Sequence, residues 1–388
     1  MTHPPRERPV SFWTTLGWAV YLACSWTWCI GMFFPVLLAR DFGLWGFVVF
    51  AVPNVIGAAA MGWVLRGRHA PRAILEKHQS MVRAFAIVTI VFQAYFLGVL
   101  LNWTGFLQAG SGVLLVLLAA GLLVPVANRA RWLAAGVFVL SAGCAVLAWR
   151  AGSLARPTPV ELPVELLWLA PVSLFGFALC PYLDPTFLRA AEMLHDGSRK
   201  VAFTLGFVVF FLPMILFTLA YGGALDTLLE SVLRSETLRG VIFLHIGAQL
   251  TFTALVHLRE LGRMRPSRRW PWVVTGLAMA AVFFGSAALD YWPDLPAFKA
   301  SAGSPELYYR VFLSFYGLIF PAFVWLCMIP TRDGHAGLAG SRGRRKLLVW
   351  CAAVGIAAPL YWMGFIMLEE FYLVPGLGVV LLARLAVR

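Results

Sequence analysis

The chain has 388 residues, of which 61% are hydrophobic and only 13% are charged, and its mean hydropathy is +0.80. A soluble domain of this length carries roughly 25% charged residues, so the composition excludes a sizeable soluble domain. The net charge of +13 raises the alternative of a nucleic-acid-binding protein. However, the basic residues lie in short segments between apolar runs, where they orient a membrane protein. We therefore expect the lipid bilayer as the surroundings and no nucleic-acid partner.

Apolar runs long enough to cross a bilayer recur from one end of the chain to the other. About 20 apolar residues span the hydrocarbon core as a helix, and these runs lack the period-two alternation of a β-barrel. The run after the basic first ten residues is too long for a signal peptide, so we interpret it as a retained span. The sequence thus predicts an all-α polytopic membrane protein with about twelve helices, at 12–38, 43–65, 82–102, 110–128, 132–149, 163–183, 200–222, 240–258, 271–290, 308–330, 347–367 and 371–386.

The Lys and Arg residues are distributed unevenly between the two sides of these spans. With the N-terminus inside, 24 of the 31 fall on the inner side, as the positive-inside rule requires. The seven on the outer side are Arg40, Arg150, Arg156, Arg234, Arg239, Lys299 and Arg310. We expect a multi-pass protein of the cell (inner) membrane with both termini in the cytoplasm.

The first and sixth spans share a glycine followed four or five residues later by a proline. These pairs are Gly31 with Pro35 and Gly176 with Pro181, and we interpret them as helix breaks. Glycine weakens a helix and proline removes a backbone donor, so each pair would free backbone polar groups at membrane depth. Both residues also occur in ordinary transmembrane helices, so the matching positions carry the inference. Spans five apart face opposite ways, which is typical of an inverted repeat with a polar site between its halves.

The breaks divide the chain into six segments. We expect a cytoplasmic N-terminal tail (1–11), a first five-helix repeat (12–149), an extracytoplasmic loop (150–162), a second five-helix repeat (163–330), a basic cytoplasmic loop (331–346) and two accessory C-terminal helices (347–388).

Two stretches carry a resemblance to a known group of transporters. The stretch 28–65, WCIGMFFPVLLARDFGLWGFVVFAVPNVIGAAAMGWVL, resembles the first two core helices of LeuT-fold transporters. These form the amino acid–polyamine–organocation superfamily, which includes the neurotransmitter:sodium and sodium:solute symporters. The segment 184–207, DPTFLRAAEMLHDGSRKVAFTLGF, resembles the sodium:solute symporter loop after the sixth core helix. The resemblance implies a LeuT-type five-plus-five inverted repeat plus two C-terminal helices, and secondary transport with Na⁺ or H⁺ as the candidate coupling ion.

Polar and aromatic side chains near the breaks are the candidate solute-binding residues. Each has packing or interhelical hydrogen bonding as its alternative role. The candidates are Ser25, Thr27, Trp28, Cys29 and Gly31 in the first span, Gly176, Phe177, Cys180 and Tyr182 in the sixth, Gln93 in the third, and His245 and Gln249 in the eighth.

The eighth span carries a polar stripe, because His245, Gln249 and Thr253 are spaced four residues apart and share one helix face. Such a stripe faces protein, water or a ligand rather than lipid. The resemblance implies a Na⁺ site here, with Thr251 or Thr253 as the ligand. In the family two hydroxyl residues are adjacent at this place, whereas Phe252 separates Thr251 from Thr253 in this chain. Interhelical hydrogen bonds of about 0.6 kcal/mol per pair are the alternative.

Asp184 is the acidic residue nearest a break, and Pro185 follows it. This order predicts an N-cap for a short interfacial helix over 185–195, with a proton relay as the alternative role. We place His195, His257 and His335 in or beside inner loops and expect no special role for them.

Motifs of covalent catalysis, phosphate binding and dinucleotide binding do not occur in the sequence. The six cysteines lie within apolar runs, so we expect no disulfide and no metal cluster. We therefore expect neither an enzyme nor a resident cofactor. The best interpretation is alternating-access transport of a small neutral or zwitterionic organic solute. A non-transporting sensor or assembly subunit on a transporter scaffold and a polytopic lipid-modifying enzyme are the alternatives.

Overall fold

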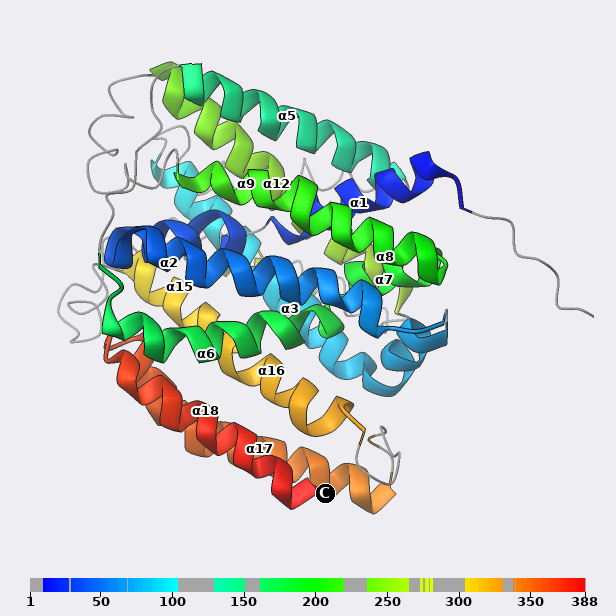
Figure 1. Cartoon of the computed structure of the whole chain (residues 1–388), viewed down its shortest axis with the longest axis vertical. Coiled ribbons are helices and arrows are strands. Elements are labelled where there is room, and N and C mark those ends of the chain that lie inside the picture. Colours follow the sequence, from blue (N-terminus) through cyan, green and yellow to red (C-terminus); the bar gives the residue numbers. More distant parts are fainter. Residues whose placement is uncertain are drawn as a thin grey trace, which may run out of the picture.

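The computed structural model describes residues 10–27, 29–67, 69–103, 129–150, 161–219, 236–264, 273–274, 276–278, 280–281, 304–330, 338 and 340–387. This part of the chain is a bundle of helices without strands (Figure 1). Within it, nine helical stretches are long and apolar enough to cross a membrane. The chain is therefore a polytopic helical membrane protein, as predicted. The predicted span 110–128 lies outside the described residues, as does most of 271–290.

The first predicted span is broken, but not where the glycine and proline indicated. Helix α1 (Phe12–Trp26) ends at Thr27, and α2 (Cys29–Val64) begins two residues later, with Gly31 and Pro35 inside it. The Thr27 amide and hydroxyl both donate to the Ala23 carbonyl, at 3.0 and 2.9 Å, which satisfies the end of α1. A proline removes a single helical hydrogen bond, and the buried surroundings keep α2 helical past Pro35. The predicted break at Gly31–Pro35 is wrong by several residues.

Helix α2 consists of two segments, 29–42 and 44–64, that meet at Gly43. Gly43 has φ 62° and ψ −151°, a conformation that favours glycine. The chain folds back there, since a Cβ placed on Gly46 would lie 2.1 Å from the Leu38 carbonyl oxygen. In a straight helix these residues would be about 12 Å apart along the axis. The turn lies at the predicted boundary between the first and second spans.

Two further helices complete the described part of the first half. Helix α3 (His69–Trp103) is bent at His78, whose φ of −126° departs from helical values. Helix α5 (Ala130–Arg150) exposes large apolar residues, among them Trp132, Val139 and Trp149. An exposed apolar face of this kind is suited to contact with lipid.

The sixth predicted span is also interrupted. Helix α6 (Val164–Leu179) narrows into the 3₁₀ segment η2 (Cys180–Leu183), and α7 (Pro185–Met193) follows. Pro181 lies inside η2, and Gly176 supplies the carbonyl to which the Cys180 amide donates at the end of α6. The Asp184 side chain accepts from the Thr186 amide, which confirms the predicted N-cap.

Helix α7, predicted as a short interfacial helix, is packed among other helices. Phe187 and Ala191 are 0% exposed and Leu188 is 3% exposed, because α7 packs against α1, α3 and α12 (Glu236–Arg263). Sequence spacing showed an apolar side to this helix but could not show that other helices surround it.

The remaining core spans contain π-helical turns, which occur frequently at functional sites. One span joins α8 (Asp196–Thr204), the π-helix η3 (Leu205–Phe211) and α9 (Leu212–Leu216). Another joins α15 (Ser304–Ser314), the π-helix η4 (Phe315–Ile319), α16 (Phe320–Phe323) and the π-helix η5 (Val324–Met328).

The C-terminal helices lie along one edge of the bundle (Figure 1). They are α17 (Gly340–Phe365), η6 (Glu370–Tyr372), α18 (Leu373–Leu382) and η7 (Ala383–Val387). Arg384 attaches this layer to the core, because its guanidinium donates to the carbonyls of Trp325, Ile329 and Pro330 at 2.6, 2.9 and 2.8 Å.

Candidate functional site

The two helix interruptions lie next to each other in the folded chain. The hydroxyl oxygen of Ser25, in the last turn of α1, lies 3.2 Å from the hydroxyl oxygen of Thr186. Thr186 is in the first turn of α7, directly after the second interruption. Both hydroxyl residues are 0% exposed. The structure thus brings together one end of each broken helix, although they are far apart in sequence.

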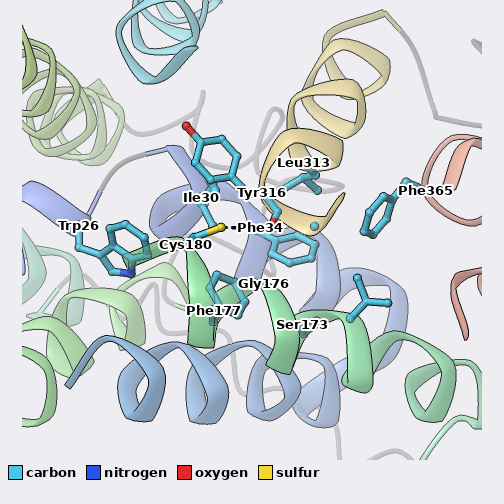
Figure 2. A pocket seen from close by; sticks show the side chains of 12 residues that line it. Trp26, Ile30, Phe34, Ser173, Gly176, Phe177, Cys180, Leu313, Tyr316 and Phe365 are labelled. Atoms are coloured by element: carbon cyan, nitrogen blue, oxygen red, sulfur yellow. Dashed lines mark hydrogen bonds between the residues drawn. The ribbon is translucent and has the colours of Figure 1, made fainter. Parts of the chain in front are cut away.

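A small pocket lies between these breaks and the span that contains η4 (Figure 2). Its volume is about 30 Å³, close to the space that one water molecule occupies in the liquid. A solute enters only if α2, α6 or η4 moves. The lining residues are Trp26, Ile30, Phe34, Val172, Ser173, Gly176, Phe177, Cys180, Leu313, Tyr316, Gly317 and Phe365. Three of the predicted solute-binding residues, Gly176, Phe177 and Cys180, are among them.

Tyr316 connects the pocket to two helices. The Cys180 thiol donates to the Tyr316 carbonyl at 3.3 Å (Figure 2). The Tyr316 hydroxyl lies 2.9 Å from the Thr89 hydroxyl on α3. A Cβ on Gly176 would lie 2.8 Å from that same carbonyl oxygen. Gly176 therefore permits the close approach of α6 to η4.

A polar network lies on another side of the first break. The Thr27 hydroxyl is 3.7 Å from the Met214 sulfur, to which the Gln249 amide donates at 3.5 Å. Ser141 of α5 joins the same network, since its Oγ lies 2.9 Å from both Gln249 Nε2 and His245 Nδ1. The predicted residues Thr27, His245 and Gln249 are thus brought together, but through Met214 and Ser141, which the sequence did not indicate.

Other predicted residues lie apart from the pocket lining. Tyr182 is half-buried, and Gln93 is 1% exposed within α3. Trp28 lies outside the described residues, and Cys29 is described only as the first residue of α2. A Cβ on Gly31 would lie 3.4 Å from a Phe211 ring carbon.

The polar stripe of α12 faces the protein interior. Thr253 is 0% exposed, and its hydroxyl has no hydrogen-bond partner in the described part of the chain. Thr251 is half-buried on another face. The proposed Na⁺ ligation by either hydroxyl therefore stays a prediction, and Thr253 is the better placed of the two.

His257 is buried inside the bundle, whereas the sequence analysis placed it in or beside an inner loop and expected no special role for it. It lies within α12, is 0% exposed, and its Nε2 is 3.8 Å from Asp184 Oδ2. The stripe of His245, Gln249 and Thr253 continues to His257 after four more residues, so the same spacing could have identified it.

Ion pairs join helices at both ends of the described bundle. At the predicted outer end, Arg310 of α15 lies 3.4 Å from Asp41 of α2, and both line a second small cavity with Glu370. At the predicted inner end, Glu192 of α7 pairs with Arg72 of α3 at 2.5 Å and with Arg189 at 3.0 Å. Partial burial raises the pKa of the Glu192 carboxyl, but the two arginines outweigh it and hold the pKa below its ordinary value.

A buried arginine stabilises the turn between α2 and α3. Arg199 is 0% exposed and donates to the carbonyls of Leu65, Gly67 and Ala191. It also pairs with Asp196 at 2.7 Å. The guanidinium thereby links the end of α2 to the start of α8.

Comparison with known proteins identifies the fold. No protein-family model and no curated protein matches the sequence. A solved structure of a Na⁺-coupled sialic acid symporter, in a substrate-bound, outward-open state, matches with a TM-score of 0.54 at 12% sequence identity. The match covers 95% of this chain and 88% of the symporter chain. The chain therefore has the fold of a secondary transporter, as the sequence resemblance implied.

Proposed function

We propose that this protein is a secondary active transporter that moves a small neutral or zwitterionic organic solute across the cell membrane by alternating access. The observation that carries the proposal is the hydrogen bond between Ser25 and Thr186, which joins two interrupted helices beside an aromatic pocket. Interrupted helices near the centre of a repeat interface form the solute sites of many secondary transporters. The shared fold with a Na⁺-coupled symporter supports the same proposal.

The pocket lining supports a solute without net charge. None of its twelve lining residues carries a charged side chain, and Trp26, Phe34, Phe177, Tyr316 and Phe365 supply aromatic surface. The N-terminus of α2 begins at Cys29, between the lining residues Trp26 and Ile30. Its partial positive charge would favour the carboxylate of a zwitterion. The proposed binding residues are accordingly Gly176, Phe177 and Cys180, together with the polar group at Ser25 and Thr27.

Ion pairs at the two ends support alternating access. The Asp41–Arg310 pair closes one end of the bundle between α2 and α15, and the Arg72–Glu192 pair closes the other between α3 and α7. Each pair joins a helix next to a break to a neighbouring helix. Both pairs are partly exposed, and such pairs contribute about 1 kcal/mol or less, so each can open at a small energetic cost.

The helix directions support the proposed orientation in the cell membrane. In Figure 1, α1 begins and α18 ends toward the same side of the bundle. The starts of α3 and α17, whose first turns include the basic residues Arg72 and Arg342, lie on that side as well. This side would be the cytoplasmic one under the positive-inside rule.

The decisive experiment begins with purified protein and a thermal-shift screen of small solutes, with and without Na⁺. A solute that binds the folded state raises its apparent stability by mass action. Hits are then tested as radiolabelled cargo in liposomes that contain the protein. We expect uptake above that of empty liposomes.

A glycine variant with a matched control tests the site. Gly176→Ala places a Cβ 2.8 Å from the Tyr316 carbonyl oxygen, whereas Gly355→Ala adds a Cβ with nothing within 4 Å. We expect Gly176→Ala to reach the membrane but to lose uptake, and Gly355→Ala to keep it. Absence of both solute binding and flux in the unaltered protein would contradict the proposal and favour the sensor or assembly scaffold.

A further inference from the structure

Asp184 has one carboxylate oxygen that is satisfied and one that is not. Its Oδ1 accepts from the Thr186 amide at 2.7 Å and from the Thr186 hydroxyl at 2.6 Å. Its Oδ2 has no hydrogen-bond partner among the described residues, and the side chain is 0% exposed. A buried carboxylate with an unsatisfied oxygen is strongly destabilising unless a proton or a cation neutralises it.

The group that faces this oxygen is an imidazole with unused nitrogens. His257 Nε2 lies 3.8 Å from Asp184 Oδ2, and neither ring nitrogen of His257 has a hydrogen-bond partner in the described part of the chain. Among the described residues, His257 has the only basic side chain with a nitrogen within 4.0 Å of an Asp184 carboxylate oxygen. This distance exceeds a hydrogen bond, but a small approach of the two atoms would let one proton join them, as a carboxyl that donates to the imidazole or an imidazolium that donates to the carboxylate.

The other titratable groups that face this pair supply no positive charge to neutralise the Asp184 carboxylate. Tyr21 approaches from α1, Cys180 from η2 and Glu260 from α12. Glu260 is paired with Arg263 at 2.5 Å and lies 3.9 Å from Arg259, so arginines neutralise its charge.

Helix α3 adds an apolar surface to the pair. Phe85 stacks on the His257 ring, with centroids 6.3 Å apart. Arg83, two residues earlier, donates to the Met264 carbonyl.

The Asp184–His257 pair lies where α7 meets α1 and α12. Asp184 is the extended residue between η2 and α7, with ψ 114°, and His257 is on α12. Through the Thr186 hydroxyl the carboxylate is also linked to Ser25 at the end of α1. A change in its protonation would alter the contact of α7 with both α1 and α12.

We propose that Asp184 and His257 together bind one transferable proton, and that its binding and release drive solute movement. The coupling step rests on the proposed transport function, whereas the proton site itself does not. A ring nitrogen opposite the free oxygen favours a proton, since Na⁺, like other hard cations, prefers a shell of oxygen ligands.

The first test detects the proton without any solute. Infrared spectra of the full-length protein in liposomes are recorded across a pH series, and the absorption of protonated carboxyl groups is followed. Asp184→Asn keeps an N-capping side chain, so the variant is expected to fold. We expect it to lose one titrating carboxyl signal. Glu161→Gln and His69→Gln, which change exposed residues, should keep that signal.

His257→Gln tests whether the imidazole takes part. We expect it to move the midpoint of the Asp184 signal by about one pH unit or more, which corresponds to about 1.4 kcal/mol. Identical titrations in the unaltered protein, Asp184→Asn and His257→Gln would overturn the proton site. A signal that responds to added Na⁺ instead of pH would overturn it in favour of a cation site.

The second test concerns coupling. Two rates are measured in liposomes: solute uptake under an imposed pH gradient and solute exchange without a gradient. The coupling ratio is the first rate divided by the second. We expect a ratio well above one in the unaltered protein and near one in Asp184→Asn and His257→Gln. A ratio that stays high in both variants, or that follows only a Na⁺ gradient, contradicts the coupling. Exchange without any gradient dependence would support transport but not this proposal, whereas no exchange at all would contradict the transport function and leave the infrared result standing.

Discussion

The Arg310 guanidinium lies 3.4 Å from the Asp41 carboxylate and joins the middle of α15 to the first segment of α2. The two side chains are 10% and 27% exposed, so water screens their attraction only in part. The sequence gave no sign of this pair, because its members are 269 positions apart. Both residues line a second small cavity, which shares Phe34, Leu313 and Phe365 with the pocket that contains Cys180.

Arg310→Gln is expected to open the predicted outer end of the bundle more often. A partly exposed ion pair contributes about 0.5–1 kcal/mol, so the open population should rise about two- to fivefold. The measurement is the rate at which maleimide labels Cys180, followed by mass spectrometry of the peptide. Arg345→Gln, at an exposed position on α17, is the control and should leave the rate unchanged. An unchanged rate in Arg310→Gln would argue against closure by this pair.

Glu192 gives a prediction about pH. Its pKa is lowered in the folded protein, so its stabilising contribution is complete above the ordinary carboxyl pKa of 4.5 and is lost as the pH falls through the folded value. Glu192→Gln should therefore unfold about 0.5–1 kcal/mol more easily at neutral pH. The difference from the unaltered protein should disappear in strongly acidic buffer. Thermal unfolding across a pH series checks this, and a difference that grows below pH 4.5 would show the sign to be wrong.

Arg199 is expected to be essential for stability. Arg199→Met leaves the carbonyls of Leu65, Gly67 and Ala191 without their donor, and each unsatisfied buried group is destabilising by about 1–3 kcal/mol. The neighbouring control is Lys200→Met, which removes a cation–π contact with Trp63 worth about 0.5–1 kcal/mol. Denaturation of the purified variants should show the much larger loss for Arg199→Met. Equal losses would mean that the guanidinium network is not the cause.

Gly31→Ala is expected to be tolerated. The added Cβ would lie 3.4 Å from Phe211 and from the Trp26 carbonyl oxygen, which is ordinary contact, and Gly31 is inside a continuous helix. Alanine is favoured over glycine within a helix by about 1 kcal/mol. Stability and solute uptake should therefore stay close to those of the unaltered protein. A loss of uptake as large as that of Gly176→Ala would show that α2 must unwind at Gly31 during transport.

The sequence located both interrupted spans but placed only one interruption well. Pro181 lies in the 3₁₀ segment before Asp184, and the aspartate–proline order predicted the cap of α7. In the first span, Pro35 predicted a break, but it lies inside the continuous helix α2. The break is instead held by the Thr27 hydroxyl, which donates to Ala23, and by the Ser25–Thr186 contact across the bundle. A contact between distant residues leaves no trace in a local pattern.

The sequence by itself determined the membrane class, because a chain this apolar can satisfy its backbone in lipid only as helices whose lengths match the bilayer. It also determined the helix faces, because spacing places His245, Gln249 and Thr253 together whatever surrounds them. Only the tertiary structure decided which of these faces meet. It buried α7, set His257 against Asp184 and left a pocket of about 30 Å³ between the breaks. The physical reason is that packing partners, unlike periodicity, depend on the whole chain folding back on itself.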